Sequence, residues 1–398
     1  MTLATGSANE RPVASRSFLY RPEVRQAIYQ VLLVVALAYA AYWLVTNVAD
    51  NLRRQNIASG FDFLGRTSGF DVAQTLIEYS NTSTYGRAFW VGLLNTLLVA
   101  GLGIVAATAI GFVVGISRLS SNWLIARLAG AYVETVRNVP LLLQLFFWYF
   151  AVLKNLPPPR QSYALPGGFF FNVRGLYVPA PEPQPGFSRV VAAFVVALVI
   201  AFGISVWARR RQAATGQRFP VLWVSLAIIV GMPLIAFIGS GAPLGWSYPE
   251  LRGFNFQGGI AVIPELIALV LGLSIYTASF IAEIVRAGIQ GVPKGQTEAA
   301  QSLGLTKSQA LRLIIVPQAA RIIIPPLTSQ YLNLTKNSSL AVAIGYPDFV
   351  SVFTGTVLNQ TGQAIEVILM TMAVFLILSL LTSIFMNWFN RRMALVER

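Results

Sequence analysis

The sequence predicts an all-α, polytopic membrane protein with about eight transmembrane helices. Of its 398 residues, 55% are apolar and only 11% are charged, and the mean hydropathy is +0.63. A soluble domain cannot bury that much apolar surface. The apolar residues also gather in runs of roughly 20, the length that spans a bilayer as a helix. These runs lie at about residues 27–46, 89–116, 130–153, 189–208, 219–239, 260–283, 322–345 and 365–388.

The basic residues predict the orientation of the chain. With the N-terminus in the cytoplasm, 18 Lys and Arg residues fall in cytoplasmic segments, 9 in the opposite loops and 2 within spans. This asymmetry follows the positive-inside rule, so both termini are expected in the cytoplasm. The basic residues of the cytoplasmic loops also account for the formal net charge of +14, so this charge does not require a nucleic-acid partner.

Several kinds of chemistry are excluded. The chain has no cysteine and no histidine, which excludes disulfides, thiolate or imidazole metal sites and catalysis by these side chains. It has no GxxxxGK[ST] motif, so it does not cradle ATP in that way. The run at 27–46 is too long for a signal-peptide core and has no clear cleavage site, so we interpret it as a retained first helix.

The loop at 154–188 on the outer side is rich in proline, from Pro157 to Pro185. Proline runs favour extended polyproline II, which predicts a stiff loop rather than a folded unit.

A polar stretch from Gly288 to Pro326 interrupts the apolar C-terminal half. It predicts one short helix over 296–303 that stops at Gly304, a residue suited to a left-handed conformation. A second helix is expected to begin with a capping box of Thr306 and Gln309 and to end before Pro317. This helix–glycine–helix elbow is either a docking surface for a partner or a part of a long cytoplasmic loop in which Gly304 and Pro317 merely end short helices.

The spacing of the elbow residues resembles the EAA loop of ABC-importer permeases. Val316 stands where that family has leucine, a mild departure. The resemblance implies that the elbow is the coupling helix that sits on a separate cytoplasmic ATPase. The residues that carry it are Glu298, Ala299, Ala300, Gly304, Ile314 and Pro317.

Flanking segments resemble the polar amino acid importers, a histidine-permease-like family, and within them the general L-amino acid permeases. Asn138-Val139 replaces the Gly-Thr of the wider family before Pro140. The similarity covers about residues 87–398. The segments are Tyr132–Phe146, Ala282–Ile289 and Lys336–Leu340.

The resemblance also implies an organisation around a type I permease core of five helices. Four parts are expected: a cytoplasmic N-terminus, first helix and outer loop at 1–88; the first part of the core at 89–153; an inserted loop and helix pair at 154–259; and the rest of the core, with the coupling loop 286–321, at 260–398.

By the same resemblance, the chain is a permease subunit in a bacterial inner membrane that translocates L-amino acids. The implied partners are a second permease subunit (a paralogue or a second copy), a cytoplasmic ABC ATPase dimer and a periplasmic amino acid binding protein. ATP and Mg²⁺ would bind to the ATPase subunit. This chain is therefore not expected to be an enzyme or to bind a cofactor.

Polar residues within the spans are candidates for structure or transport. Glu134–Arg137 and Glu283–Arg286 are each spaced three apart on one helix face and predict structural ion pairs. Other polar residues serve either as interhelical hydrogen-bonding groups or as the lining of an amino acid path. The candidate path residues are Asn95, Thr96, Arg137, Pro140, Gln144, Asn337, Ser338 and Ser339.

An alternative is an ion-coupled secondary amino acid transporter or channel, in which Glu134 and Glu366 would hold ions. That hypothesis leaves the spacing of the elbow unexplained. A membrane enzyme or flippase is a third class, and the sequence offers no catalytic constellation for it.

Overall fold

A computed structural model describes residues 22–54, 59–217 and 219–393 of the chain. Five basic residues that entered the orientation argument, Arg11, Arg16, Arg21, Arg218 and Arg398, lie outside the described residues. The helices are α1 (Pro22–Arg54), α2 (Tyr85–Ser117), α3 (Trp123–Asn138), α4 (Leu141–Phe146), α5 (Phe187–Thr215), α6 (Val221–Gly239), α7 (Pro264–Gln290), α8 (Lys294–Ser302), α9 (Lys307–Ala310), α10 (Val316–Asn337), α11 (Leu358–Thr361) and α12 (Ala364–Met393).

The helices confirm the predicted polytopic membrane fold. Seven helices within the described residues are long and apolar enough to span a membrane, or eight if a bent pair counts as one span. That pair is α3 and the helical stretch Leu141–Asn155, which meet at an angle of 106°. The third predicted span, at 130–153, is therefore broken at Pro140. Pro140 lacks the N–H that an unbroken helix needs there, and the chain turns at that point.

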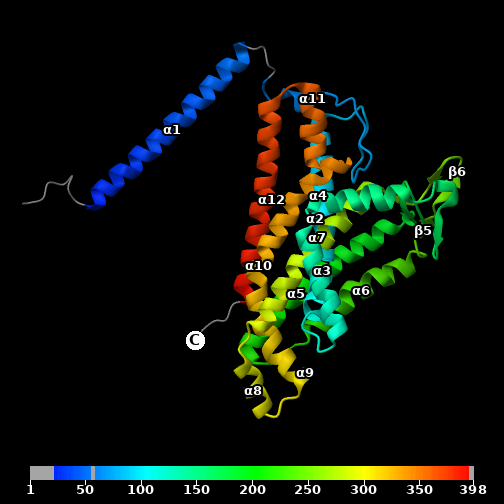
Figure 1. Ribbon diagram of the computed structural model, residues 1–398. Coiled ribbons are helices and arrows are strands. Elements are labelled where there is room, and N and C mark those ends of the chain that lie inside the picture. Colours follow the sequence, from blue (N-terminus) through cyan, green and yellow to red (C-terminus); the bar gives the residue numbers. More distant parts are fainter. Residues whose placement is uncertain (1–21, 55–58, 218, 394–398) are drawn as a thin grey trace, which may run out of the picture.

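The core is built around α2 and α7, which run side by side (Figure 1). Glycine makes the close contact possible. A β-carbon on Gly111 would lie 2.6 Å from the side chain of Ile281, and one on Gly115 would lie 2.7 Å from the backbone oxygen of Ala282. Small residues allow helix backbones to approach closely in a membrane, where dispersion contacts stabilise the packing. Helices α10 and α12 complete this bundle.

Helices α5 and α6 form a separate antiparallel pair whose main helix contact is with each other. Helix α5 buries only Ala197, Ala201 and Ala208, and α6 has no buried residue. The apolar window of α1 is likewise 0% buried within the chain. The described side chains of these three helices are therefore little buried within the chain, whereas 56% of the corresponding window of α7 is buried.

The loop at 154–188 is not the stiff polyproline segment that its composition predicts. It forms strands that pair with the segment 244–262, so the prediction of an unfolded loop is wrong. The strands form three antiparallel sheets, β1-β2-β3-β8, β4-β5 and β6-β7. Their bounds are β1 (Tyr163–Leu165), β2 (Phe169–Asn172), β3 (Gly175–Val178), β4 (Ala180–Pro183), β5 (Leu244–Ser247), β6 (Glu250–Arg252), β7 (Asn255–Gln257) and β8 (Ile260–Val262).

Strand β4 contains prolines because they alternate with other residues. Ala180 lies opposite Ser247 and Glu182 opposite Gly245, and the N–H of Gln184 donates to the carbonyl of Pro243. The backbone N–H groups of the even-numbered residues therefore point toward β5. The prolines between them occupy positions whose N–H would point to the free edge, so no strand hydrogen bond is lost. The extended structure of β4 thus depends on its pairing with β5, which follows in the chain after α5 and α6.

The segment 59–84 packs over one end of the bundle. Phe63 is fully buried there. The backbone N–H of Gly60 donates to the carboxylate of Glu366 at 2.6 Å. Glu366, a candidate ion site in the secondary-transporter alternative, thus holds this segment against the start of α12.

Candidate coupling elbow and intramembrane polar sites

The elbow has the local structure that its sequence predicts. Helix α8 ends just before Gly304, whose φ of 74° is the left-handed conformation that glycine adopts without strain. Thr306 then caps α9: its hydroxyl accepts from the N–H of Gln309 at 3.3 Å, and the Gln309 side chain accepts from the N–H of Thr306 at 2.9 Å. Both halves of the capping box are present.

The second helix of the elbow does not end before Pro317, contrary to the prediction. A π-helical segment, Leu311–Ile315, joins α9 to α10 without a break. Pro317 lies in the first turn of α10, where its lack of an N–H costs little. The wider π turn directly before it shifts the hydrogen-bond pattern, so the chain continues as one helix toward Asn337.

The elbow projects beyond the end of the bundle (Figure 1). Glu298 and Ala299 are exposed, whereas Ala300 is 1% exposed and packs inward. Leu303, at the tip, is 79% exposed. Among the described residues Glu298 takes part in no ion pair, so its carboxylate is available on the outer surface. Ile314 and Pro317 are half-buried where the elbow returns to the bundle.

A network of charges ties the root of the elbow to α2. Glu283 on α7 forms the predicted ion pair with Arg286 and a second one with Arg118, the residue that follows α2. Arg286 also donates to the side chain of Gln290 at 2.7 Å. The sequence did not predict Arg118 as a partner of Glu283, because the two residues lie 165 positions apart. Arg118 entered the sequence analysis only as a basic residue of a cytoplasmic loop.

The bend after α3 is stabilised by Gln144. Without an N–H on Pro140, the carbonyl of Val136 loses its helical partner. The side-chain amide of Gln144 donates to that carbonyl and to the carbonyl of Val139, both at 2.9 Å. Two candidate path residues, Pro140 and Gln144, therefore act together: one opens the helix and the other satisfies the exposed backbone.

Asn95 and Thr96 on α2 are fully buried and serve as interhelical hydrogen-bonding groups. The Asn95 amide donates to the carbonyls of Gln74 and Pro347, each at 2.9 Å. The Thr96 hydroxyl accepts from the N–H of Phe349 at 3.0 Å. They anchor the turn that leads from α10 to α12 on α2.

The third group of candidates lies at the end of α10. Asn337 is its last residue and is half-buried. Ser338 is buried and donates to the carbonyl of Thr335 at 2.8 Å, and Ser339 donates to that of Lys336 at 2.7 Å. Ser339 lines a cavity against α12, separate from the one that Arg137 lines.

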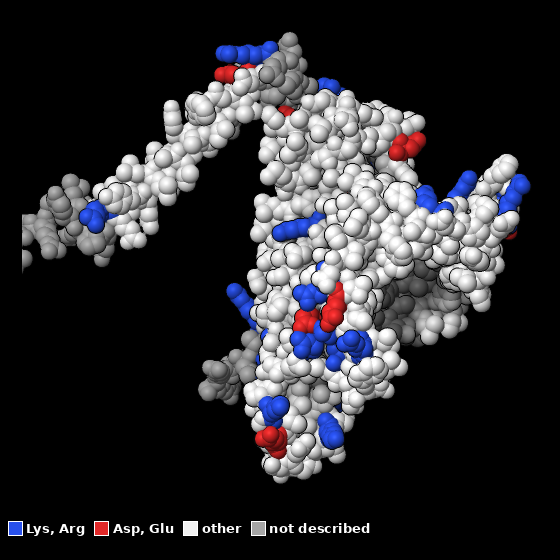
Figure 2. Space-filling model, in the orientation of Figure 1, with Lys and Arg blue, Asp and Glu red and all other residues white. Residues whose placement is uncertain are grey.

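Glu134 and Arg137 do not form the predicted ion pair. In the part of the chain that the structure describes, neither takes part in any ion pair. The guanidinium of Arg137 instead lies over the ring of Phe280, 4.9 Å from its centre. Both side chains are exposed and line a cavity of about 450 Å³. Figure 2 shows basic and acidic side chains gathered on this face of the bundle, above the elbow.

Comparison with known proteins identifies the family. Residues 101–395 match the family described as binding-protein-dependent transport system inner membrane component. The chain is 57% identical to the general L-amino acid transport system permease protein AapQ of Rhizobium johnstonii, over 96% of each chain. It is 40% identical to the glutamate/glutamine/aspartate/asparagine transport system permease protein BztB of Rhodobacter capsulatus, again over 96% of each. The chain therefore belongs to the family of inner-membrane permease components of binding-protein-dependent ABC transporters, in which the ATPase is a separate subunit.

Proposed function

We propose that the chain forms one half of a pore that imports L-amino acids, and that its elbow receives the movement of the ATPase. The observation that carries this function is the elbow itself, with its capped two-helix structure, exposed Glu298 and apolar tip. The two relatives, which their names describe as amino acid permeases and which align over nearly the whole chain, support the substrate class.

The route of the movement follows the contacts at the root of the elbow. A β-carbon on Gly288 would lie 2.3 Å from Ile323, so α7 and α10 are in close contact where they flank the elbow. Glu283 joins α7 to Arg118 at the end of α2. A displacement of the elbow thus moves α7, α10 and α2 together as a packed unit, which is what alternating access requires.

In this proposal the elbow end of the bundle is cytoplasmic and both termini are on that side, as the positive-inside count favours. A second permease subunit, a paralogue of this chain, completes the pore. We keep the predicted four-part division of the chain in this proposal, with α5 and α6, which have few buried residues, as a peripheral pair outside the core.

Two elbow variants test the coupling. Glu298→Lys reverses an exposed charge, and Gly304→Asp places a side chain at a φ of 74°. Each is expected to reduce uptake of L-amino acids at least ~10-fold in proteoliposomes that contain the complete complex, while the subunits still purify together. Gly295→Ala, also on α8, is the matched control because a β-carbon there meets no atom within 4 Å.

Full uptake by both elbow variants would refute the coupling role. Uptake by this chain alone in liposomes, driven by an ion gradient and without an ATPase, would instead support the ion-coupled alternative.

A further inference from the structure

Most of the polar groups expected to hold an amino acid are already engaged within the chain. The amide nitrogens of Asn95 and Gln144 and the hydroxyls of Thr96 and Ser338 already form hydrogen bonds with backbone groups of the chain. Glu134 and Arg137 are different, because no ion pair among the described residues neutralises either charge.

These two charges lie on one wall of a cavity between α2, α3 and α7. The cavity is lined by Arg118, Val133, Glu134, Arg137, Asn138, Phe280 and Glu283. Its volume of about 450 Å³ is within the ~300–1,000 Å³ typical of small-molecule sites. Glu283 is paired with Arg118 and with Arg286, so among the charged lining residues Glu134 and Arg137 are the two without an ion pair in the described chain.

The cavity is open at the surface and extends along α7 to Phe280. Phe280 lies ten residues before Gln290, the end of α7, which corresponds to ~15 Å along the helix. The hydroxyl of Tyr132 donates to the carbonyl of Ile275 at 2.6 Å, so α3 is held against the middle of α7. Charged side chains at this depth face water or a ligand rather than lipid.

We propose that this cavity is a transit site for the zwitterionic part of an α-amino acid. The guanidinium of Arg137 binds the α-carboxylate, and the carboxylate of Glu134 binds the α-ammonium. The two residues stand three apart on one helix face, so both can reach a single small molecule. Stacking on Phe280 keeps the guanidinium in position.

The inference rests on the proposed import of amino acids and narrows its substrate class. A site that binds the two charges common to all α-amino acids does not select a side chain. Neutral, acidic and small polar amino acids share these groups, and molecules that lack one of them do not fit.

The test measures binding of radiolabelled L-alanine to the purified permease–ATPase complex in detergent, without the binding protein. Unlabelled L-alanine is expected to displace the label. L-Alaninamide, which lacks the carboxylate, and propionate, which lacks the ammonium, are expected to compete at least ~10-fold more weakly.

Variants of Glu134 and Arg137 test whether their charges bind the amino acid. Glu134→Gln and Arg137→Gln are each expected to weaken binding at least ~10-fold, and the double exchange of Glu134→Arg with Arg137→Glu to restore most of it. A variant that only damaged the fold would not be rescued by the exchange. Arg211→Gln is the control, since Arg211 is an exposed arginine on α5 that stacks on Trp207.

Equal competition by all three compounds, or unchanged binding in both single variants, would overturn the site. Failure of L-alanine to bind the wild-type complex would overturn it as well. These outcomes leave the proposed function intact if the wild-type complex imports L-amino acids in proteoliposomes. Absence of any such import would refute the proposed function itself.

Discussion

Two pairs of membrane-spanning helices, α2 with α7 and α5 with α6, differ in how they use glycine. In the first pair Gly111 and Gly115 bring the backbones so close that a β-carbon would overlap with the partner helix. In the second pair Gly203, Gly231 and Gly239 have no atom within 4 Å of the position of a β-carbon. All four helices are similarly apolar, so hydropathy does not reveal this difference.

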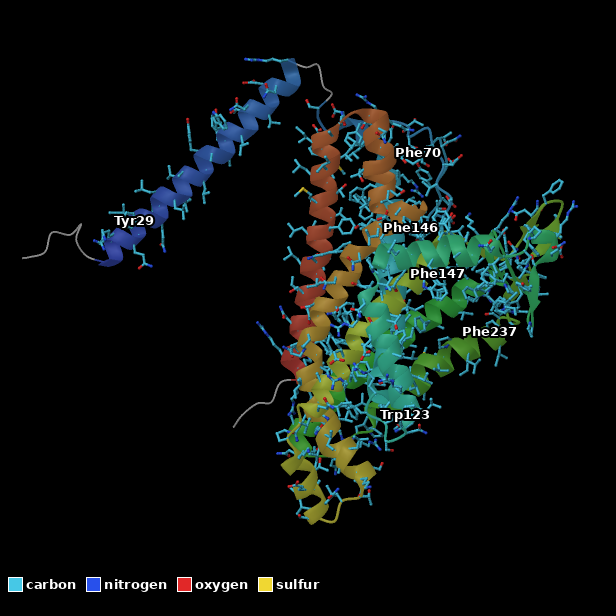
Figure 3. All side chains as sticks on the ribbon, viewed as in Figure 1. Tyr29, Phe70, Trp123, Phe146, Phe147 and Phe237 are labelled. Carbon is cyan, nitrogen blue, oxygen red and sulfur yellow. The ribbon has the colours of Figure 1, made fainter. Side chains whose placement is uncertain are left out.

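The comparison shows which helices have one defined neighbour within the chain. A glycine contact holds α2 and α7 at one distance and one angle, and the turn at 346–349 is pinned to α2 by Asn95 and Thr96. The α5–α6 pair carries outward-facing Val, Leu and Phe side chains, which suit lipid or another subunit equally well. Figure 3 shows Phe237, near the end of α6, to one side of the bundle. The α2–α7 pair is therefore expected to be more sensitive to substitution than the α5–α6 pair.

The largest effect is expected from Gly115→Val. The added side chain would meet the carbonyl of Ala282 and the side chain of Val285, and overpacking of this kind costs ~1–3 kcal/mol or more. Uptake and the yield of assembled complex should both fall sharply. Gly203→Val on α5 is the matched control, and an equal loss in both variants would contradict the distinction between the pairs.

A smaller loss is expected from Gln144→Leu at the bend. The change keeps the volume but leaves the carbonyls of Val136 and Val139 without their donor, at a cost of ~1–3 kcal/mol. Thermal unfolding of the purified complex should begin at a lower temperature. Gln212→Leu, an exposed glutamine on α5, should leave the midpoint unchanged. If the two variants unfold alike, the bend does not depend on Gln144.

The smallest effect is expected from Gly231→Ala in α6. No atom lies near the new methyl group, and alanine favours a helix over glycine by ~1 kcal/mol, so the midpoint should stay constant or rise slightly. Gly111→Ala, in contact with Ile281, should lower it. A loss in Gly231→Ala similar to that in Gly111→Ala would mean that α6 is packed against another subunit in the complex.

Much of the fold could be predicted from local signals. Hydropathy located the spans because each helix satisfies its own backbone hydrogen bonds in the membrane. The capping box at Thr306 and the left-handed Gly304 were recognisable because capping depends on residues only three or four apart. Proline at position 140 is also visible in the sequence, although its consequence, a bend of 106°, is not.

The errors share one cause. Prolines at 157–185 suggested an extended loop, but the strands there pair with residues 244–262, beyond two helices. Glu134 and Arg137 have the spacing of an ion pair, yet Arg137 stacks on Phe280, which lies 143 residues further along the chain. A periodicity argument identifies which residues share a face and cannot identify what that face meets.

The sequence by itself determined the membrane class, the approximate spans, the elbow and its spacing, because composition, helix caps and charge bias act within short stretches of chain. Only the tertiary structure decided that α2 and α7 form the packed centre, that Glu283 binds Arg118, and that Glu134 and Arg137 line a common cavity. These features depend on contacts between segments more than a hundred residues apart. Such contacts are selected by packing of the whole bundle, so no local pattern specifies them.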